Sequence, residues 1–441
     1  MANIYNYLQN VWLKISNLTK QPSVFIYLLA AILVAIPLKY IFGSISSILF
    51  VIVTFCYIPR TKPTFSKPLI LPIAFFVLMV LSLFWTRDFT LSSNALQKEL
   101  SFFFIPLAFL FLPKLTKQDF RKTFRIFSFG MAIFALYYFI NASIRFFETG
   151  EKSVFFYHEL VTMDLNAIYV SVFASFALFY FITTECKFLI EKIALVILII
   201  LVFLLSSKSI ITIDFLLVIC YYSFFAKIQN GVKSTTIIAV FSFLLFSILF
   251  VKEVKQRFLL EYQTAFVDNT VNGSIGNENE KVYNVSLKQA WNNQSFQTNH
   301  FFPGTALRVY QTRIFKEMLL EQNIFFTGFG LNASQEKIKE KANQHNLYLG
   351  YGEFNFHNQY IQTFAELGFF GFLILVGMLF YNLKNGWQQK DFLHIAFAVT
   401  MIILFLSESF FCRQRGVIFF ITIYCMLNGR HVLKKTENYK V

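Results

Sequence analysis

Two arginines and a histidine stand close together in the sequence of an otherwise strongly apolar chain. Arg308 and Arg313 precede a Gly-Phe-Gly turn at 328–330, and His357 is followed by Asn358 where a membrane helix is expected to begin. Arginine recognises phosphate oxygens through a planar, permanently charged guanidinium. Histidine can act as a general base or hydrogen-bond a phosphate. These residue types predict a site that binds a pyrophosphate and accepts a proton.

The two arginines are not expected to contribute equally. If both lie on one helix, their five-residue spacing turns them about 140° apart, so they cannot share a stripe. We expect one to face the site and the other to face lipid headgroups or an acidic neighbour. For either arginine alone, a position among lipid headgroups with no role in the reaction is the alternative.

The start of the helix after His357 offers further polar groups. Its N-terminal turn has free N–H groups and a positive dipole end, which favour a nearby anion. Gln359, Gln362 and Glu366 follow at three- and four-residue steps and should share one face. A carboxylate this deep in a membrane helix must face the protein interior or a wet cavity. The alternatives are that His357 only anchors the helix at the interface and that Glu366 is a buried structural partner.

The sequence offers one further cation for the site and no metal-binding motif. Lys208 lies in a serine-rich element, LLSSKSIITI, and could add positive charge to the site, although a lysine that extends to the interface is an equal alternative. The sequence has no DxD, HExxH or P-loop pattern, and Glu278 and Glu280 fall in a polar stretch expected to be mobile. We therefore expect no carboxylate-bound Mg²⁺ at the phosphate site and no cofactor.

The elements that must position these residues are membrane helices. The chain has 441 residues, of which 56% are hydrophobic and 14% charged, with 60 Phe, so it carries more apolar surface than a soluble core could bury. The net charge of +15 comes from short clusters between apolar runs, which is typical of membrane topology and not of nucleic-acid binding. Five cysteines stand singly, at 56, 186, 220, 412 and 425, and predict neither a disulfide framework nor a metal site.

A membrane about 30 Å thick needs roughly 20 apolar residues per helix. On that basis the sequence predicts an all-α, polytopic membrane protein with about twelve helices, the first of them retained and not a cleaved signal. The predicted segments are Ser23–Tyr40, Ser44–Ile58, Leu69–Trp85, Leu100–Leu112, Phe124–Phe146, Ala167–Thr184, Phe188–Leu205, Ile210–Phe225, Thr235–Val251, Tyr360–Leu383, Phe392–Ser407 and Val417–Leu427.

Basic residues in alternate connections place both termini in the cytoplasm and the long polar segment outside. The predicted organisation is nine helices over 1–251, a periplasmic loop over 252–357, and three helices with a cytoplasmic tail over 358–441. Within the loop, Asp268–His300 is expected to be mobile. Arg308–Gln322 and Ala333–Ala342 are expected to be helices, and no separate soluble domain is indicated.

The order of these elements resembles the signature of the O-antigen ligase and polymerase superfamily of bacterial envelope glycosyltransferases. The resemblance rests on Arg308, the turn at 328–330, His357-Asn358, and then Glu366 and Gly368 followed by Gly371. The stretch SLFWTRDFTLSSNALQKELSFFFIPL, the serine-basic cluster at Ser206–Lys208 and the late polar loop support it. The resemblance covers most of the chain, and the order of its loose motifs makes it specific.

The resemblance implies a metal-independent membrane glycosyltransferase of the C type. Such an enzyme takes a glycan from undecaprenyl pyrophosphate at the periplasmic face of the bacterial inner membrane; in the ligase branch the acceptor is lipid A–core oligosaccharide. By position, His357 matches the histidine proposed to activate the acceptor hydroxyl, and Arg308 matches the arginine that holds the pyrophosphate. Arg313 is a possible substitute for Arg308 in this role. Lys208 stands where the family commonly has arginine; a lysine there keeps the positive charge but cannot bind an anion in the bidentate manner of arginine.

Two other functions remain open. An O-antigen polymerase of the Wzy type would use a second lipid-linked glycan as acceptor and shares the same signature. A transporter of lipid-linked sugars would also have about twelve helices, but it should carry paired polar groups and broken helices near the bilayer midplane, and here the polar residues gather at the outer interface. A ligase is the leading interpretation, with Asn358, Gln359 and Glu366 as further substrate-binding candidates.

Overall fold

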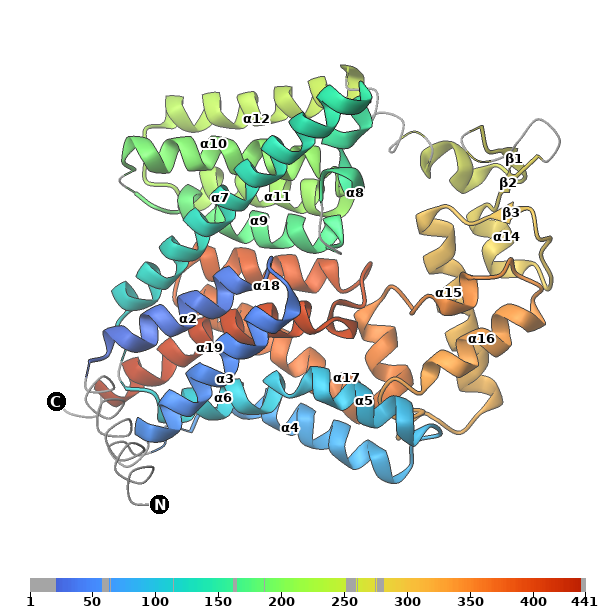
Figure 1. Cartoon of the computed structure of the whole chain (residues 1–441), viewed down its shortest axis with the longest axis horizontal. Helices are drawn as coiled ribbons and strands as arrows, with labels where there is room; N and C mark the ends of the chain where they lie inside the picture. Colours follow the sequence, from blue (N-terminus) through green and yellow to red (C-terminus); the bar gives the residue numbers. More distant parts are fainter. Residues whose placement is uncertain are drawn as a thin grey trace.

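The structure is a computed structural model, and it describes residues 21–437 except for 58–62, 64, 114, 162–164, 186, 251–258, 260, 274 and 276–280. Parts of the topology and cysteine predictions fall on residues outside this description, including Cys186, Glu278 and Glu280. Most described residues are helical, and a small sheet lies in the polar segment (Figure 1).

A helix overlaps each of the twelve apolar runs expected from the sequence. These helices are α2 (Ser23–Ala35), α3 (Tyr40–Tyr57), α4 (Lys67–Leu81), α6 (Ser101–Phe111), α7 (Lys117–Thr149), α9 (Ala167–Ile182), α10 (Leu189–Leu204), α11 (Lys208–Cys220), α12 (Asn230–Phe250), α17 (Gln359–Gln388), α18 (Phe392–Leu404) and α19 (Gln414–Glu437). Short helices α5 (Phe89–Glu99) and α8 (Tyr157–Leu160) were not expected.

Five of the described helical stretches are long and apolar enough to cross a membrane. They are Tyr40–Tyr57, Lys67–Phe84, Lys117–Thr149, Lys208–Phe225 and Gln359–Gln388. Three shorter apolar helices, Ser23–Ala35, Ala167–Ile182 and Phe392–Leu404, lie among them. The chain is therefore a multi-pass membrane protein by length and composition, while the number twelve and the sidedness of the polar segment stay predictions.

Aromatic side chains fill the bundle and explain much of the phenylalanine content. The long α7 packs against α2, α9 and α10, and α17 packs against α4 and α18. Near the centre Phe411 meets Phe102 edge to face, with ring centroids 4.9 Å apart, and lies 5.0 Å from Phe405 and from Phe420. Such edge contacts add to the burial of apolar area. The loop before α19 is thereby fixed between helices.

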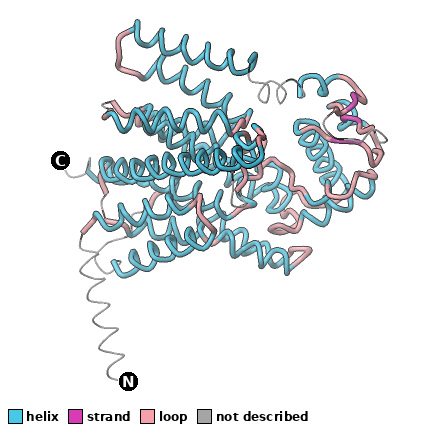
Figure 2. Tube along the Cα trace, turned by 45° about the horizontal axis from the view of Figure 1, so that its top comes forward, coloured by secondary structure: helices cyan, strands magenta, loops and turns pink. Residues whose placement is uncertain are grey.

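The polar segment between α12 and α17 has a hydrophobic core of its own. It contains α14 (Leu287–Asn292), α15 (Gly304–Glu321), α16 (Ser334–Gln344) and a three-stranded sheet of β1 (Thr270–Val271), β2 (Tyr283–Asn284) and β3 (His300–Phe301). Figure 2 shows these strands beside the helices at one end of the molecule. The core includes Phe296, Phe302, Tyr310, Ile314 and Met318, all buried.

The expectation of a mobile loop over Asp268–His300 was therefore wrong for its described residues. The Asn284 side chain accepts a hydrogen bond from Asn272 Nδ2 at 3.0 Å and donates to the Thr270 carbonyl at 3.1 Å. Buried amides that satisfy one another allow a polar stretch to fold. Composition alone could not reveal these pairings.

Helix α17 is broken at Gly368, where the backbone takes φ 66° and ψ −164°. The sequence predicted one continuous helix over Tyr360–Leu383, so this break is a correction. Gly368 lies against the backbone of Phe326, into which a Cβ on Gly368 would project. Phe369 N–H donates to the Phe325 carbonyl at 2.8 Å in place of an intrahelical bond.

The segment 325–330 joins this break to the N-terminal half of the chain. Phe329 N–H donates to the Ala365 carbonyl at 2.8 Å, and the Phe329 carbonyl accepts from Arg87 N–H at 3.1 Å. Trp85 Nε1 donates to the Thr327 carbonyl at 2.9 Å. The Gly-Phe-Gly turn is thus a backbone junction between the first half of α17 and the stretch before α5.

Candidate active site

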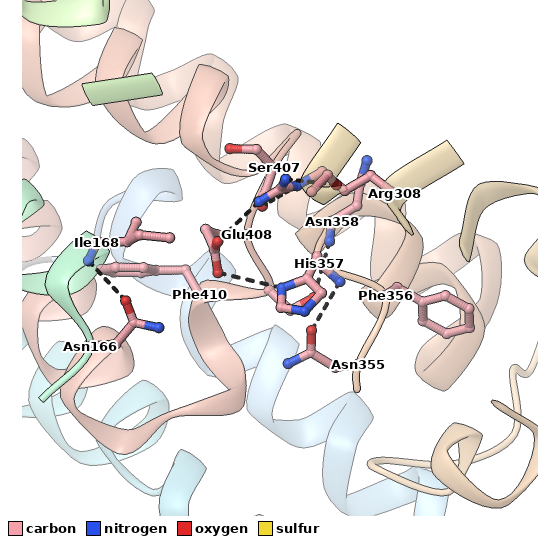
Figure 3. A network of polar contacts seen from close by, with 12 residues as sticks. Asn166, Ile168, Arg308, Asn355, Phe356, His357, Asn358, Ser407, Glu408 and Phe410 are labelled. Atoms are coloured by element: carbon pink, nitrogen blue, oxygen red, sulfur yellow. Dashed lines mark hydrogen bonds and ion pairs between the residues drawn. The ribbon is translucent and has the colours of Figure 1, made fainter. Parts of the chain in front are cut away.

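The candidate site centres on Glu408, in the loop between α18 and α19. Figure 3 shows its carboxylate between Arg308 and His357. Glu408 Oε1 lies 3.3 Å from Arg308 Nη2, and Oε2 lies 3.7 Å from His357 Nδ1. The Glu408 side chain is 8% exposed, whereas those of Arg308 and His357 are 31% and 27% exposed. A buried carboxylate thus links two groups that reach the surface.

Arg308 is held by backbone as well as by charge. It lies on the second turn of α15, where its Nη1 donates to the Gly304 carbonyl at 3.0 Å. Its Nε donates to the Ser407 carbonyl at 2.9 Å. These contacts fix the plane of the guanidinium, which carries more N–H donors than they use. The remaining donors can bind an anion from the exposed side.

His357 sits on a constrained turn immediately before α17. Its φ is 45°, a conformation uncommon for residues other than glycine, and its backbone N–H donates to Asn355 Oδ1 at 2.9 Å. Asn358 caps the helix, since its Oδ1 accepts from Ile361 N–H at 3.1 Å, and its own N–H donates to Ser409 Oγ at 3.1 Å. The turn aims the imidazole at Glu408.

The acidic partner also bears on the tautomer of His357. Nδ1 is buried and has no hydrogen-bond acceptor within bonding range, but the Glu408 carboxylate lies 3.7 Å away. A proton on Nδ1 would face this carboxylate and leave Nε2 free to accept another proton. The geometry therefore suits a histidine that serves as a base through Nε2.

Gln359 and Glu366 lie apart from this contact. Gln359 is buried and its side chain accepts from Phe411 N–H at 2.7 Å and donates to Thr363 Oγ1 at 3.0 Å, so its polar groups hold the loop before α19. Glu366 is buried deeper on the same face, as expected, and accepts from Gln362 Nε2 at 2.5 Å. A role for Gln359 and Glu366 in binding substrate stays a prediction. In the structure both residues form hydrogen bonds within the protein.

Lys208 is linked to the surroundings of Arg308 by a second carboxylate, that of Glu261. Its Nζ lies 3.0 Å from Glu261 Oε1, and Glu261 Oε2 accepts from Thr305 Oγ1 at 2.6 Å at the start of α15. Glu261 Oε1 and Arg308 Nη1 lie on the same side of Gly304, 3.1 and 3.2 Å from where its Cβ would be. Lys208 therefore belongs to the same neighbourhood as Arg308.

The environment of Glu261 favours its charged form. Burial alone would raise its pKa, but the hydrogen bond from Thr305 and the ammonium of Lys208 outweigh burial, and the net effect lowers the pKa of Glu261. The carboxylate is thus ionised at neutral pH and paired with Lys208. An anionic ligand would have to compete with it for that lysine.

Arg313 faces another group of residues. Its Nε lies 2.8 Å from Glu317 Oε1, and the other carboxylate oxygen of Glu317 lies 3.1 Å from Lys341 Nζ and 3.5 Å from His345 Nε2. The two arginines point different ways, as the helical spacing predicted. Arg308 is the one beside His357.

Sequence reasoning missed the two carboxylates that connect the cations. Glu408 stands in LFLSESFF, where a single acid among apolar residues is the only signal, and Glu261 stands in QRFLLEYQ with none. Among the described residues, no group of three or more His, Cys, Asp or Glu is arranged to hold a metal ion. The arrangement can bind an anion through Arg308 and Lys208 and accept a proton at His357.

Comparison with protein families shows what part of the chain resembles. The family model described as O-antigen ligase, Wzy_C, matches residues 193–376, a range that contains Lys208, Arg308 and His357 and ends shortly after the break in α17. Glu408 lies beyond the matched range. No curated protein sequence matches the chain.

Proposed function

We propose that the protein is a glycan ligase, because residues 193–376 match the family model described as O-antigen ligase. In this proposal the protein, a membrane glycosyltransferase of the ligase and polymerase group, takes a glycan from undecaprenyl pyrophosphate and transfers it to lipid A–core. The reaction would take place at the periplasmic face of the inner membrane. The observation that carries the proposal is the contact of Arg308 and His357 with one buried carboxylate, Glu408.

The reaction needs a group that stabilises a pyrophosphate as it leaves. Arg308 has free N–H donors on its exposed side, and Lys208 lies near the same end of α15. Charge-assisted hydrogen bonds from arginine to phosphate are short and strong. As the bond between the anomeric carbon and the pyrophosphate oxygen breaks, the electron pair stays on that oxygen, and the two cations stabilise the charge.

The reaction also needs a base for the acceptor hydroxyl. His357 Nε2 would take the proton while the hydroxyl oxygen bonds to the anomeric carbon, and undecaprenyl pyrophosphate departs. Glu408 would stabilise the imidazolium that forms, because its carboxylate faces Nδ1. Every charge in this step is supplied by side chains, so the proposal requires no metal ion and no cofactor.

The test is glycan transfer by purified protein in EDTA. Wild type, His357→Ala and Arg308→Ala would be mixed with undecaprenyl-pyrophosphate-linked glycan and lipid A–core. His300→Ala is a matched control, since His300 lies in β3 away from Glu408 and contacts Gln297. We expect transfer by wild type and the control, and none by the other two variants when their thermal unfolding shows that they are folded.

The products separate the competing functions. Lengthening of the lipid-linked glycan without attachment to core would favour the polymerase, whose site chemistry is the same. Neither product from intact wild type would contradict both enzymes and favour transport of lipid-linked sugars. Transfer that persists in folded His357→Ala would refute the role given to the histidine.

A further inference from the structure

A second polar site borders the first turns of α17. A cavity of about 40 Å³ lies between α4, α5, α17 and the loop before α19. Glu99 at the end of α5 and Glu366 on α17 both line it, and they are 6% and 7% exposed. Glu99 has no part in the proposed transfer reaction, and Glu366 has no step in it beyond the substrate binding expected from the sequence.

The two carboxylates differ in what satisfies them. Glu366 accepts hydrogen bonds from Gln362 Nε2 and from the backbone N–H of Asn332. Glu99 Oε2 is buried and has no hydrogen-bond partner among the residues that the structure describes. Glu99 also lies close enough to Glu366 for the two charges to repel, and the nearby ammonium of Lys98 offsets only part of that repulsion. A buried, unpartnered carboxylate oxygen beside a second carboxylate is costly unless a positive group lies between them.

We propose that this cavity binds one hydrated divalent cation of the Mg²⁺ or Ca²⁺ type between Glu99 and Glu366. Hard divalent cations take oxygen ligands, and Mg²⁺ in particular is held by one or two carboxylates while it keeps several waters. Asn332 lines the same cavity and can supply a further oxygen. The pair of charges matches the charge of the ion.

The size of the cavity selects this kind of ligand. A water needs about 10–15 Å³ of such volume, so about 40 Å³ has room for roughly three water-sized groups, or one ion and two waters. A sugar ring would not fit. Lys98 also lines the cavity and is exposed, so the cavity reaches the protein surface at this residue.

The ion would stabilise the parts that position His357 without taking part in the reaction. It would join α5 to the first half of α17, the half that carries His357 at its start. Gln362, which donates to Glu366, also accepts from Phe356 N–H at 3.2 Å, next to the histidine. Chelation should therefore lower the unfolding temperature and leave transfer intact at temperatures well below it.

The experiment is calorimetric titration of the chelator-treated, purified full chain with Mg²⁺ and with Ca²⁺, beside thermal unfolding. Wild type should bind one ion per chain and show a saturable rise in unfolding temperature. Glu99→Gln and Glu366→Gln should lose both effects. Glu353→Gln, which changes an exposed carboxylate paired with Lys339, should keep them.

Two results would overturn the inference. One is wild type that neither binds nor is stabilised by millimolar ion, which would mean that the pair holds only protons and water. The other is binding that folded Glu99→Gln retains. If Glu99→Gln does not fold, Glu99→Asp keeps the charge on a shorter side chain and should bind more weakly. No glycan is present in these measurements, so they succeed or fail independently of the proposed transferase activity.

Discussion

Replacing Gly368 by alanine should destabilise the junction between α17 and the segment 325–330. At φ 66° and ψ −164° the backbone occupies a region used almost only by glycine, and forcing another residue there costs about 1–3 kcal/mol. A Cβ would also press on the Phe326 carbonyl. Moving it would weaken the bonds of Phe369 to Phe325 and of Phe329 to Ala365, together about 1–3 kcal/mol. The expected total is roughly 2–6 kcal/mol.

The matched control is Gly377→Ala, nine residues further along the same helix. A Cβ at Gly377 would meet only Leu71 Cδ1 at 3.7 Å and Cδ2 at 4.0 Å, which is ordinary contact. Alanine in a helix interior is favoured over glycine by about 1 kcal/mol, so this variant should be as stable as wild type or more so. Thermal unfolding of both purified proteins measures the difference. Equal unfolding temperatures for Gly368→Ala and Gly377→Ala would refute the broken-helix account.

The remaining predictions concern the cations. Arg308→Lys should slow transfer by roughly 10- to 100-fold, because lysine keeps the charge but loses the planar guanidinium, and hydrogen bonds to charged groups are worth about 1.5–3 kcal/mol. Arg313 is paired with Glu317, so Arg313→Lys should leave the transfer rate within a few-fold of wild type. An equal loss of rate in both variants would contradict the assignment of Arg308 to the site. The lowered pKa of Glu261 makes its ion pair with Lys208 stabilising above the ordinary carboxyl range and lost as pH falls through the lowered value. Unfolding temperature should therefore drop in acid more for wild type than for Glu261→Gln, and parallel curves would contradict the pairing.

The helices could be predicted from the sequence because lipid imposes a simple requirement. Backbone N–H and C=O groups in the membrane must form their hydrogen bonds within a helix, so each long apolar run of the sequence predicts a helix. The helix expected over Arg308–Gln322 became α15, Gly304–Glu321, because the apolar spacing at Tyr310, Ile314 and Met318 matches its buried face. These features depend on neighbours a few residues away.

The break in α17 and the carboxylates of the site depend on distant neighbours. Gly368 looks the same in sequence whether it packs against a helix or breaks one, and only the segment 325–330 decides between these. Glu408 lies 100 residues from Arg308 along the chain, and nothing local marks it as the partner. Arg308 and His357 could be proposed because a family resemblance supplied the distant relation that spacing does not.

The junction at the Gly-Phe-Gly turn also constrains how the protein is made. Trp85 donates to the Thr327 carbonyl across 242 residues of chain, and Arg87 bonds to Phe329 at the same place. At translation rates of roughly 5–20 residues per second, the stretch before α5 must wait about 12–48 seconds for its partner to be synthesised. During biogenesis, Trp85 and Arg87 therefore lack their hydrogen-bond partners in the segment 325–330 until the second half of the chain has been synthesised.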